Sequence, residues 1–140
     1  MAASKRAVIV RPGEGKRVAN VEFLARSDDT SRFNLAVITL EPFAEGPGMH
    51  THPDEDDAFY MLEGELVFTV DGEDLVAGPG TFILVPPGVP HSFDNRTDRL
   101  ARLVNVHAPA GFDRRLEADG RVPEQRSSSG RRQDGAGGRA

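Results

Sequence analysis

The sequence predicts an all-β protein in which antiparallel strands form a sandwich or a barrel. Short apolar runs recur along the chain, turn residues separate them, and apolar and polar side chains alternate within several of them. Short strands at regular spacing with such turns are typical of antiparallel sandwiches and barrels. The expected strands are Ala7–Arg11, Val18–Ala25, Phe33–Glu41, Asp57–Leu62, Glu65–Val70, Asp74–Ala77, Thr81–Val85, His91–Asn95 and Leu100–His107.

Turn residues bound these strands in order along the chain. Pro12-Gly13 ends the first strand, and Pro79-Gly80 precedes the seventh. Two hairpins in the middle are well specified. Leu66, Phe68 and Val70 alternate with Glu65, Val67 and Thr69, and Asp71-Gly72 then supplies the positive φ angles of a tight turn. Glu63-Gly64 plays the same part at the preceding connection.

The C-terminal region departs from this pattern. One short helix is expected over Gly111–Asp119, where Phe112, Arg115 and Leu116 share a face. From residue 121 onward, a composition rich in Ser, Gly and Arg does not support packing, so this tail is expected to be disordered. The chain is therefore divided into N-terminal strands at 1–32, a β core at 33–110, a short helix at 111–120 and a tail at 121–140.

Composition excludes several kinds of site and partner. The chain has no Cys, which rules out disulfides and thiolate metal ligands. Its net charge is −5, and residues 121–140 hold five Arg against one Glu and one Asp, so the first 120 residues carry −8. An acidic body does not favour nucleic acid as a partner. Because no apolar run has the length of a membrane span or a signal peptide core, we expect a cytoplasmic protein without a membrane partner.

Histidine is scarce, and three of the four His stand at 50, 52 and 91. His50 and His52 are two residues apart, which on a strand places both side chains on one face. Asp57 opens the next alternating run, where its side chain can point inward, and His91 follows a rigid turn at 86–90. Three imidazoles and one carboxylate suit Fe, Mn, Co, Ni, Cu or Zn, and a six-coordinate ion would keep two positions open. We therefore expect one divalent transition metal ion as cofactor.

These residues resemble the two sequence motifs of the cupin superfamily. The second motif is matched at every fixed position by Gly80, Pro86, Gly88, His91 and Asn95. The first is resembled by Gly46, His50, His52 and Gly64, with two residues fewer than usual between Gly46 and His50. The resemblance spans residues 33–110. It implies a small single-domain cupin with a double-stranded jelly roll, and a metal ion held inside by His50, His52, His91 and Asp57.

The acidic position departs from the family pattern, which usually has Glu where this chain has Asp57. Asp is one methylene shorter, whereas a carboxylate ligand must approach an ion such as Zn to roughly 2.0–2.2 Å. Four alternatives stay open: the strand moves inward, a water bridges, the three His bind alone, or Glu55 swings in from the preceding loop.

Two classes of function follow from the resemblance. An enzyme similar to quercetinases or polyketide cyclases would act on a small aromatic, diketone or polyketide-like substrate. The reaction would be oxygenation, or isomerisation or cyclisation, with Asp57 as general base. A module without catalysis would bind a small molecule, because fold does not fix function. The resemblance also implies a homodimer, with the apolar stretches Val8–Val10 and Val21–Leu24 as candidate contacts.

Four further residues are expected to contact the substrate. Phe59, Met61 and Phe93 share the strand parity of a predicted metal ligand, so they are candidates for the wall of a pocket. His107 ends an alternating strand, where two roles stay open: proton shuttle and hydrogen-bonded scaffold.

Overall fold

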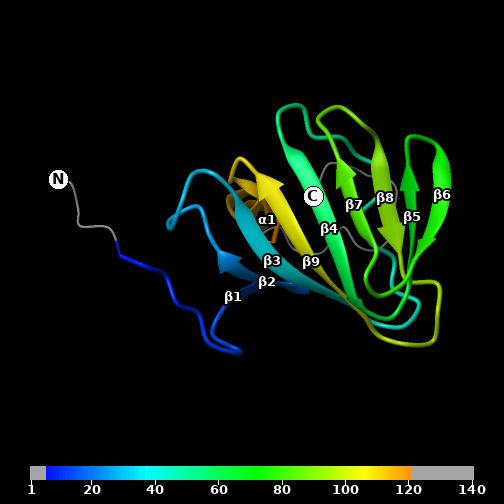
Figure 1. Cartoon of the computed structure of the whole chain (residues 1–140), viewed down its shortest axis with the longest axis horizontal. Coiled ribbons are helices and arrows are strands. Elements are labelled where there is room, and N and C mark those ends of the chain that lie inside the picture. Colours follow the sequence, from blue (N-terminus) through cyan, green and yellow to red (C-terminus); the bar gives the residue numbers. More distant parts are fainter. Residues whose placement is uncertain (1–5, 121–140) are drawn as a thin grey trace.

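The computed structural model describes residues 6–120, and strands dominate that part of the chain (Figure 1). The elements are β1 (Lys16–Val18), β2 (Val21–Ala25), β3 (Asn34–Leu40), β4 (Asp56–Glu63), β5 (Leu66–Val70), β6 (Glu73–Ala77), β7 (Phe82–Val85), β8 (His91–Asp94), β9 (Ala101–Ala108) and α1 (Phe112–Gly120). The single helix confirms the one predicted near the C-terminus. The predicted tail at 121–140 lies outside the described residues. No helix within residues 6–120 is long and apolar enough to cross a membrane.

The strands form two antiparallel sheets. The larger sheet has the order β1-β2-β3-β9-β4-β7, and the smaller has the order β6-β5-β8. Isolated bridges from Glu45 to Asp94 and from His50 to His91 tie the segment before β4 to β8 in the smaller sheet. This arrangement confirms the predicted antiparallel jelly roll.

Strict alternation explains why the central strands form and where the core lies. Along β3 and β9, buried and half-buried side chains alternate at every position, as a period of two requires for strands with one face in the core. Aromatic rings complete the core between the sheets: the Phe59 ring centroid lies 5.0 Å from that of Phe68 and 5.4 Å from that of Phe93.

Two of the N-terminal strand predictions are wrong in detail. Ala7–Arg11 pairs with no strand of the described residues, and Val8 and Ile9 remain 56% and 71% exposed. The run Val18–Ala25 divides into β1 and β2, because Ala19 adopts a φ of 54° in the turn of a hairpin. Both outcomes depend on which partner strand is available, which composition does not reveal.

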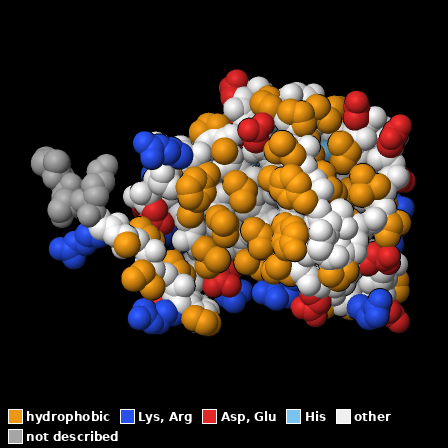
Figure 2. All heavy atoms as spheres, in the orientation of Figure 1, with side chains coloured by type: hydrophobic (Ala, Val, Ile, Leu, Met, Phe, Trp, Pro, Cys, Tyr) orange, Lys and Arg blue, Asp and Glu red, His pale blue; other side chains and the backbone are white. Residues whose placement is uncertain are grey.

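Apolar side chains gather on the outer face of the larger sheet. Figure 2 shows them on the side that β3, β9 and β4 turn to the viewer. Tyr60, Phe82 and Leu84 are exposed there, and Tyr60 lies opposite Phe82 across the β4–β7 pair. The predicted homodimer contact at Val21–Leu24 has less exposed surface than this outer face, because β2 lies between β1 and β3 in the sheet and Val21 is buried.

Two motif glycines permit close approach of backbone segments around the first motif. A Cβ at Gly46 would collide with the Phe93 carbonyl, and one at Gly64 with the Leu100 carbonyl. Gly64 also has a φ of 76°, which side-chain-bearing residues rarely adopt. Because these two residues lack a Cβ, the chain can lie close to β8 at Gly46 and to the start of β9 at Gly64.

Candidate metal centre

Separate parts of the chain carry the four predicted ligands to one place. His50 and His91 form a bridge in which each backbone N–H donates to the other's carbonyl, at 3.1 and 2.9 Å. Asp57 reaches the same point from β4, and His52 lies on the connection between them. One ligand atom from each residue lies within 4.8 Å of the others. All four residues are buried: Asp57 and His91 are 2% and 1% exposed, and His50 and His52 are each 7% exposed.

Backbone carbonyls fix the orientation of two of the imidazoles. Nδ1 of His50 lies 2.7 Å from the Gly48 carbonyl, and Nδ1 of His91 lies 2.9 Å from the Val89 carbonyl. A carbonyl only accepts hydrogen bonds, so each Nδ1 carries the proton. A neutral ring then directs the Nε2 lone pair into the cluster, which is how proteins commonly orient metal-binding histidines.

One carboxylate oxygen of Asp57 faces the Nε2 atoms of His91 and His52. Oδ2 lies 2.9 Å from Nε2 of His91 and 3.2 Å from Nε2 of His52. Because His91 donates through Nδ1, its neutral form brings a lone pair against the carboxylate. Two acceptors this close require a cation between them, either a second proton or a metal ion. The donor set therefore fits a divalent metal.

Burial prepares His50 for metal binding. It lowers the pKa of His50 to about 4; the hydrogen bond to Gly48 opposes this effect, and repulsion from His91 and His52 adds to it. His50 is therefore neutral at pH 7, which is the form that binds metal ions.

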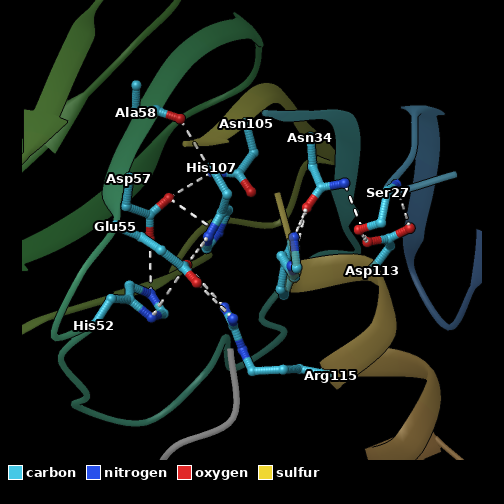
Figure 3. Close-up of polar contacts among 12 residues, drawn as sticks. Ser27, Asn34, His52, Glu55, Asp57, Ala58, Asn105, His107, Asp113 and Arg115 are labelled. Carbon is cyan, nitrogen blue, oxygen red and sulfur yellow. Dashed lines mark hydrogen bonds and ion pairs between the residues drawn. The ribbon is translucent and has the colours of Figure 1, made fainter. Parts of the chain in front are cut away.

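The second oxygen of Asp57 is held from β9 (Figure 3). Nδ2 of Asn105 donates to Oδ1 at 2.7 Å and to the Ala58 carbonyl at 3.0 Å, and Nε2 of His107 lies 3.2 Å from Oδ1. Burial by itself raises the pKa of Asp57. Contacts with the His52 and His91 imidazoles, with His107 and with the Asn105 amide nevertheless hold that pKa well below its usual range. The carboxylate is thus ionised and fixed in orientation.

A second carboxylate continues this network toward helix α1. Nδ1 of His107 donates to Oε1 of Glu55 at 3.0 Å, and the Arg115 guanidinium donates to both oxygens of Glu55 at 2.6 and 2.9 Å (Figure 3). Glu55 also groups with His52 and His107, and His52 is the residue that this group shares with the four-residue cluster. Of the two carboxylates considered as ligands, Asp57 is the one that lies among the three His. The Arg115 contact was not predicted, because nothing local to either residue signals it.

The match to a protein family agrees with this geometry. Residues 36–107, more than half of the chain, match the Cupin_2 family, described as a cupin domain. The chain is a cupin. Cupins commonly bind a divalent metal, in agreement with the cluster of three His and one Asp.

Two curated relatives and one solved structure illustrate the similarity. The HTH-type transcriptional regulator PuuR of Escherichia coli is 36% identical over 52 residues, which are 37% of this cupin and 28% of PuuR. Quercetin 2,3-dioxygenase of Bacillus subtilis is 32% identical over 110 residues, 75% of this cupin and 32% of that enzyme. The chain thus spans less than a third of the length of these relatives. The structure of KdgF from Halomonas sp. shares the fold, with a TM-score of 0.64 and 17% identity over 79% of this cupin and 99% of that chain.

In this cupin, the side chains predicted to contact substrate lie behind the ligands. Phe59, Met61 and Phe93 are buried in the core, and the Phe59 ring centroid lies 6.2 Å from that of His91. His107 is buried between two carboxylates. Contact of these four residues with substrate stays a prediction.

Proposed function

We propose that this cupin binds one divalent transition metal ion through His50, His52, His91 and Asp57 and uses it on a small aromatic, diketone or polyketide-like substrate. The observation that carries the proposal is the 2.9 Å approach of Asp57 Oδ2 to Nε2 of a His91 that donates through Nδ1. A metal ion satisfies both acceptors. When bound, it would supply Lewis-acid chemistry that stabilises negative charge on a substrate oxygen.

The protein's own groups would set the orientation and the access of this centre. The Gly48 and Val89 carbonyls orient two imidazoles. Phe59 and its aromatic neighbours exclude water behind the ligands. Because His50 and His52 retain some exposure, substrate would approach from their side.

Asp57 is better suited to hold the ion than to remove a proton. A general base works best when its pKa lies near the working pH. The pKa of Asp57 is held well below its usual range, and both of its oxygens already have partners. We therefore propose Asp57 as a ligand, and the general-base role expected from the sequence is not favoured.

Similarity to quercetin 2,3-dioxygenase over 75% of this chain supports oxygenation over isomerisation or cyclisation. The chain spans 32% of that enzyme, so the proposal concerns the cupin unit alone. A non-catalytic module that binds a small molecule is the second candidate. Similarity to PuuR favours it, because a segment shared with a transcriptional regulator fits a site that binds without turnover.

Metal analysis and turnover assays on the untagged protein test the proposal. We expect one metal ion per wild-type chain, a strong loss of metal in His50→Ala and His91→Ala, and turnover of a flavonol or diketone panel only by loaded wild type. Bound Fe or Cu would favour oxygenation, and bound Zn would favour isomerisation or cyclisation. A wild-type site that refuses all added metals would contradict the metal proposal. Loaded protein that binds panel compounds without converting them would favour the binding module.

A further inference from the structure

A line of polar contacts joins the C-terminal helix to the proposed metal site (Figure 3). Arg115 on α1 holds both oxygens of Glu55 at 2.6 and 2.9 Å. Oε1 of Glu55 accepts from Nδ1 of His107 at 3.0 Å, and Nε2 of His107 lies 3.2 Å from Oδ1 of Asp57. The Arg115 side chain is 43% exposed, whereas that of His107 is 2% exposed. The contacts therefore run from the molecular surface to the buried ligand carboxylate.

The first turn of α1 is anchored so that it does not shift independently of His107. Oδ1 of Asn34 accepts from the backbone N–H groups of Gly111 and Phe112, both at 2.9 Å, and its Nδ2 donates to Asp113 at 3.1 Å. The Phe112 ring stacks on the His107 ring, with centroids 4.2 Å apart and an angle of 16° between the planes. A displacement of the helix thus moves the ring that contacts Asp57.

The same contacts determine where the second carboxylate points. Oε1 of Glu55 lies 3.9 Å from Nδ1 of His52, the ring nitrogen opposite the Nε2 that faces Asp57, so Glu55 lies outside the ligand cluster. The forked guanidinium of Arg115 pairs with both carboxylate oxygens, a geometry that favours a fixed orientation. Arg115 thereby holds Glu55 against His107, and His107 in turn contacts the proposed ligand Asp57.

We propose that Arg115 and Glu55 are positioning residues of the metal centre, which fix Asp57 through His107 and let helix α1 set the affinity for the ion. Neither residue is among the proposed ligands. The inference rests on the metal site proposed above.

Cobalt binding to purified full-length variants tests this role. The dissociation constant for Co²⁺ is measured by competition with a chromophoric chelator, and the visible spectrum of the loaded protein reports the coordination. We expect Arg115→Ala and Glu55→Gln each to weaken binding about tenfold, the lower end for residues that orient ligands, and to change the spectrum. Arg115→Lys should recover part of the affinity, because it keeps the charge and loses the fork.

Arg114→Ala is the matched control on the same helix. Arg114 forms an ion pair with Asp28 at 2.9 Å, and both side chains are exposed, so its removal should leave cobalt affinity and spectrum unchanged. Far-UV circular dichroism and thermal unfolding of the metal-free variants verify that each is folded. If Arg115→Ala does not fold, Glu55→Gln, which keeps the side-chain size, decides the question.

The cobalt measurements distinguish failure of the positioning role from failure of the metal site. Tight cobalt binding by wild type, with the same affinity and spectrum in the Arg115→Ala and Glu55→Gln variants, overturns the positioning role and leaves the metal site standing. Wild type that binds no cobalt overturns both. The Arg115→Ala/Glu55→Gln double variant should lose no more cobalt affinity than either single variant, because Arg115 acts through Glu55. If the double variant instead loses the sum of the two single losses in binding free energy, the two residues act independently and the proposed line of contacts is overturned.

Discussion

Acid is predicted to destabilise the metal-free protein through His50. Burial lowers the pKa of this side chain from 6.5 to about 4. Below pH 6.5 the unfolded chain takes up a proton that the folded chain does not accept. The contribution of His50 to the free energy of unfolding is therefore complete above about pH 6.5, and it falls as the pH decreases toward 4.

The size of the effect follows from the two pKa values of His50. At 1.36 kcal/mol for each unit, their difference corresponds to about 3 kcal/mol, and about 2 kcal/mol of this is lost between pH 7.5 and pH 5. Asp57 and Glu55 act in the same direction, because their pKa values are also lowered in the folded protein. Their stabilisation is present above their ordinary pKa values of 3.8 and 4.5 and is lost as the pH falls below them, so its loss adds little to the change between pH 7.5 and pH 5.

Urea unfolding in the presence of a chelator measures this loss. Far-UV circular dichroism is the suitable signal, because the chain has no Trp and a single Tyr. The control is His50→Asn, whose side-chain amide retains a donor for the Gly48 carbonyl and does not titrate. We expect the free energy of unfolding to fall by about 2 kcal/mol more in wild type than in the variant between pH 7.5 and pH 5. Equal pH dependence in the two proteins would refute the argument.

Two other predictions concern the fold and its outer face. Asn95→Ala should lower the free energy of unfolding by about 3 kcal/mol, because the buried Asn95 amide donates to three backbone carbonyls and its oxygen accepts from Thr97. Urea unfolding at neutral pH measures this, and a loss below about 1 kcal/mol would show that water replaces those bonds. We also predict a homodimer through the apolar outer face, since a chain with −8 over its first 120 residues can approach a second copy most easily over uncharged surface. Light scattering should give a dimer mass for wild type and a monomer mass for Phe82→Glu, and a monomeric wild type would remove the prediction.

Residues close together in the chain made much of the site predictable. The two-residue spacing predicted that His50 and His52 point to the same place, although His50 forms only an isolated bridge and His52 lies on the connection before β4. The rigid turn at 86–90 sets the start of β8, which carries His91. Local rules also predicted the hairpin at Asp71-Gly72 and the helix near Phe112. The hairpin and the helix each depend on a few consecutive residues, so the sequence contains their signal in full.

The tertiary structure decided how far each carboxylate reaches and what holds it. Glu55 meets Arg115 across 60 positions, and Asn105 meets Asp57 across 48. Such contacts exist only once strand pairing and helix docking have fixed the distances. The sequence by itself therefore determined the jelly roll and the candidate ligands, whereas only the folded chain brought Asp57 to the histidines and paired Glu55 with the helix.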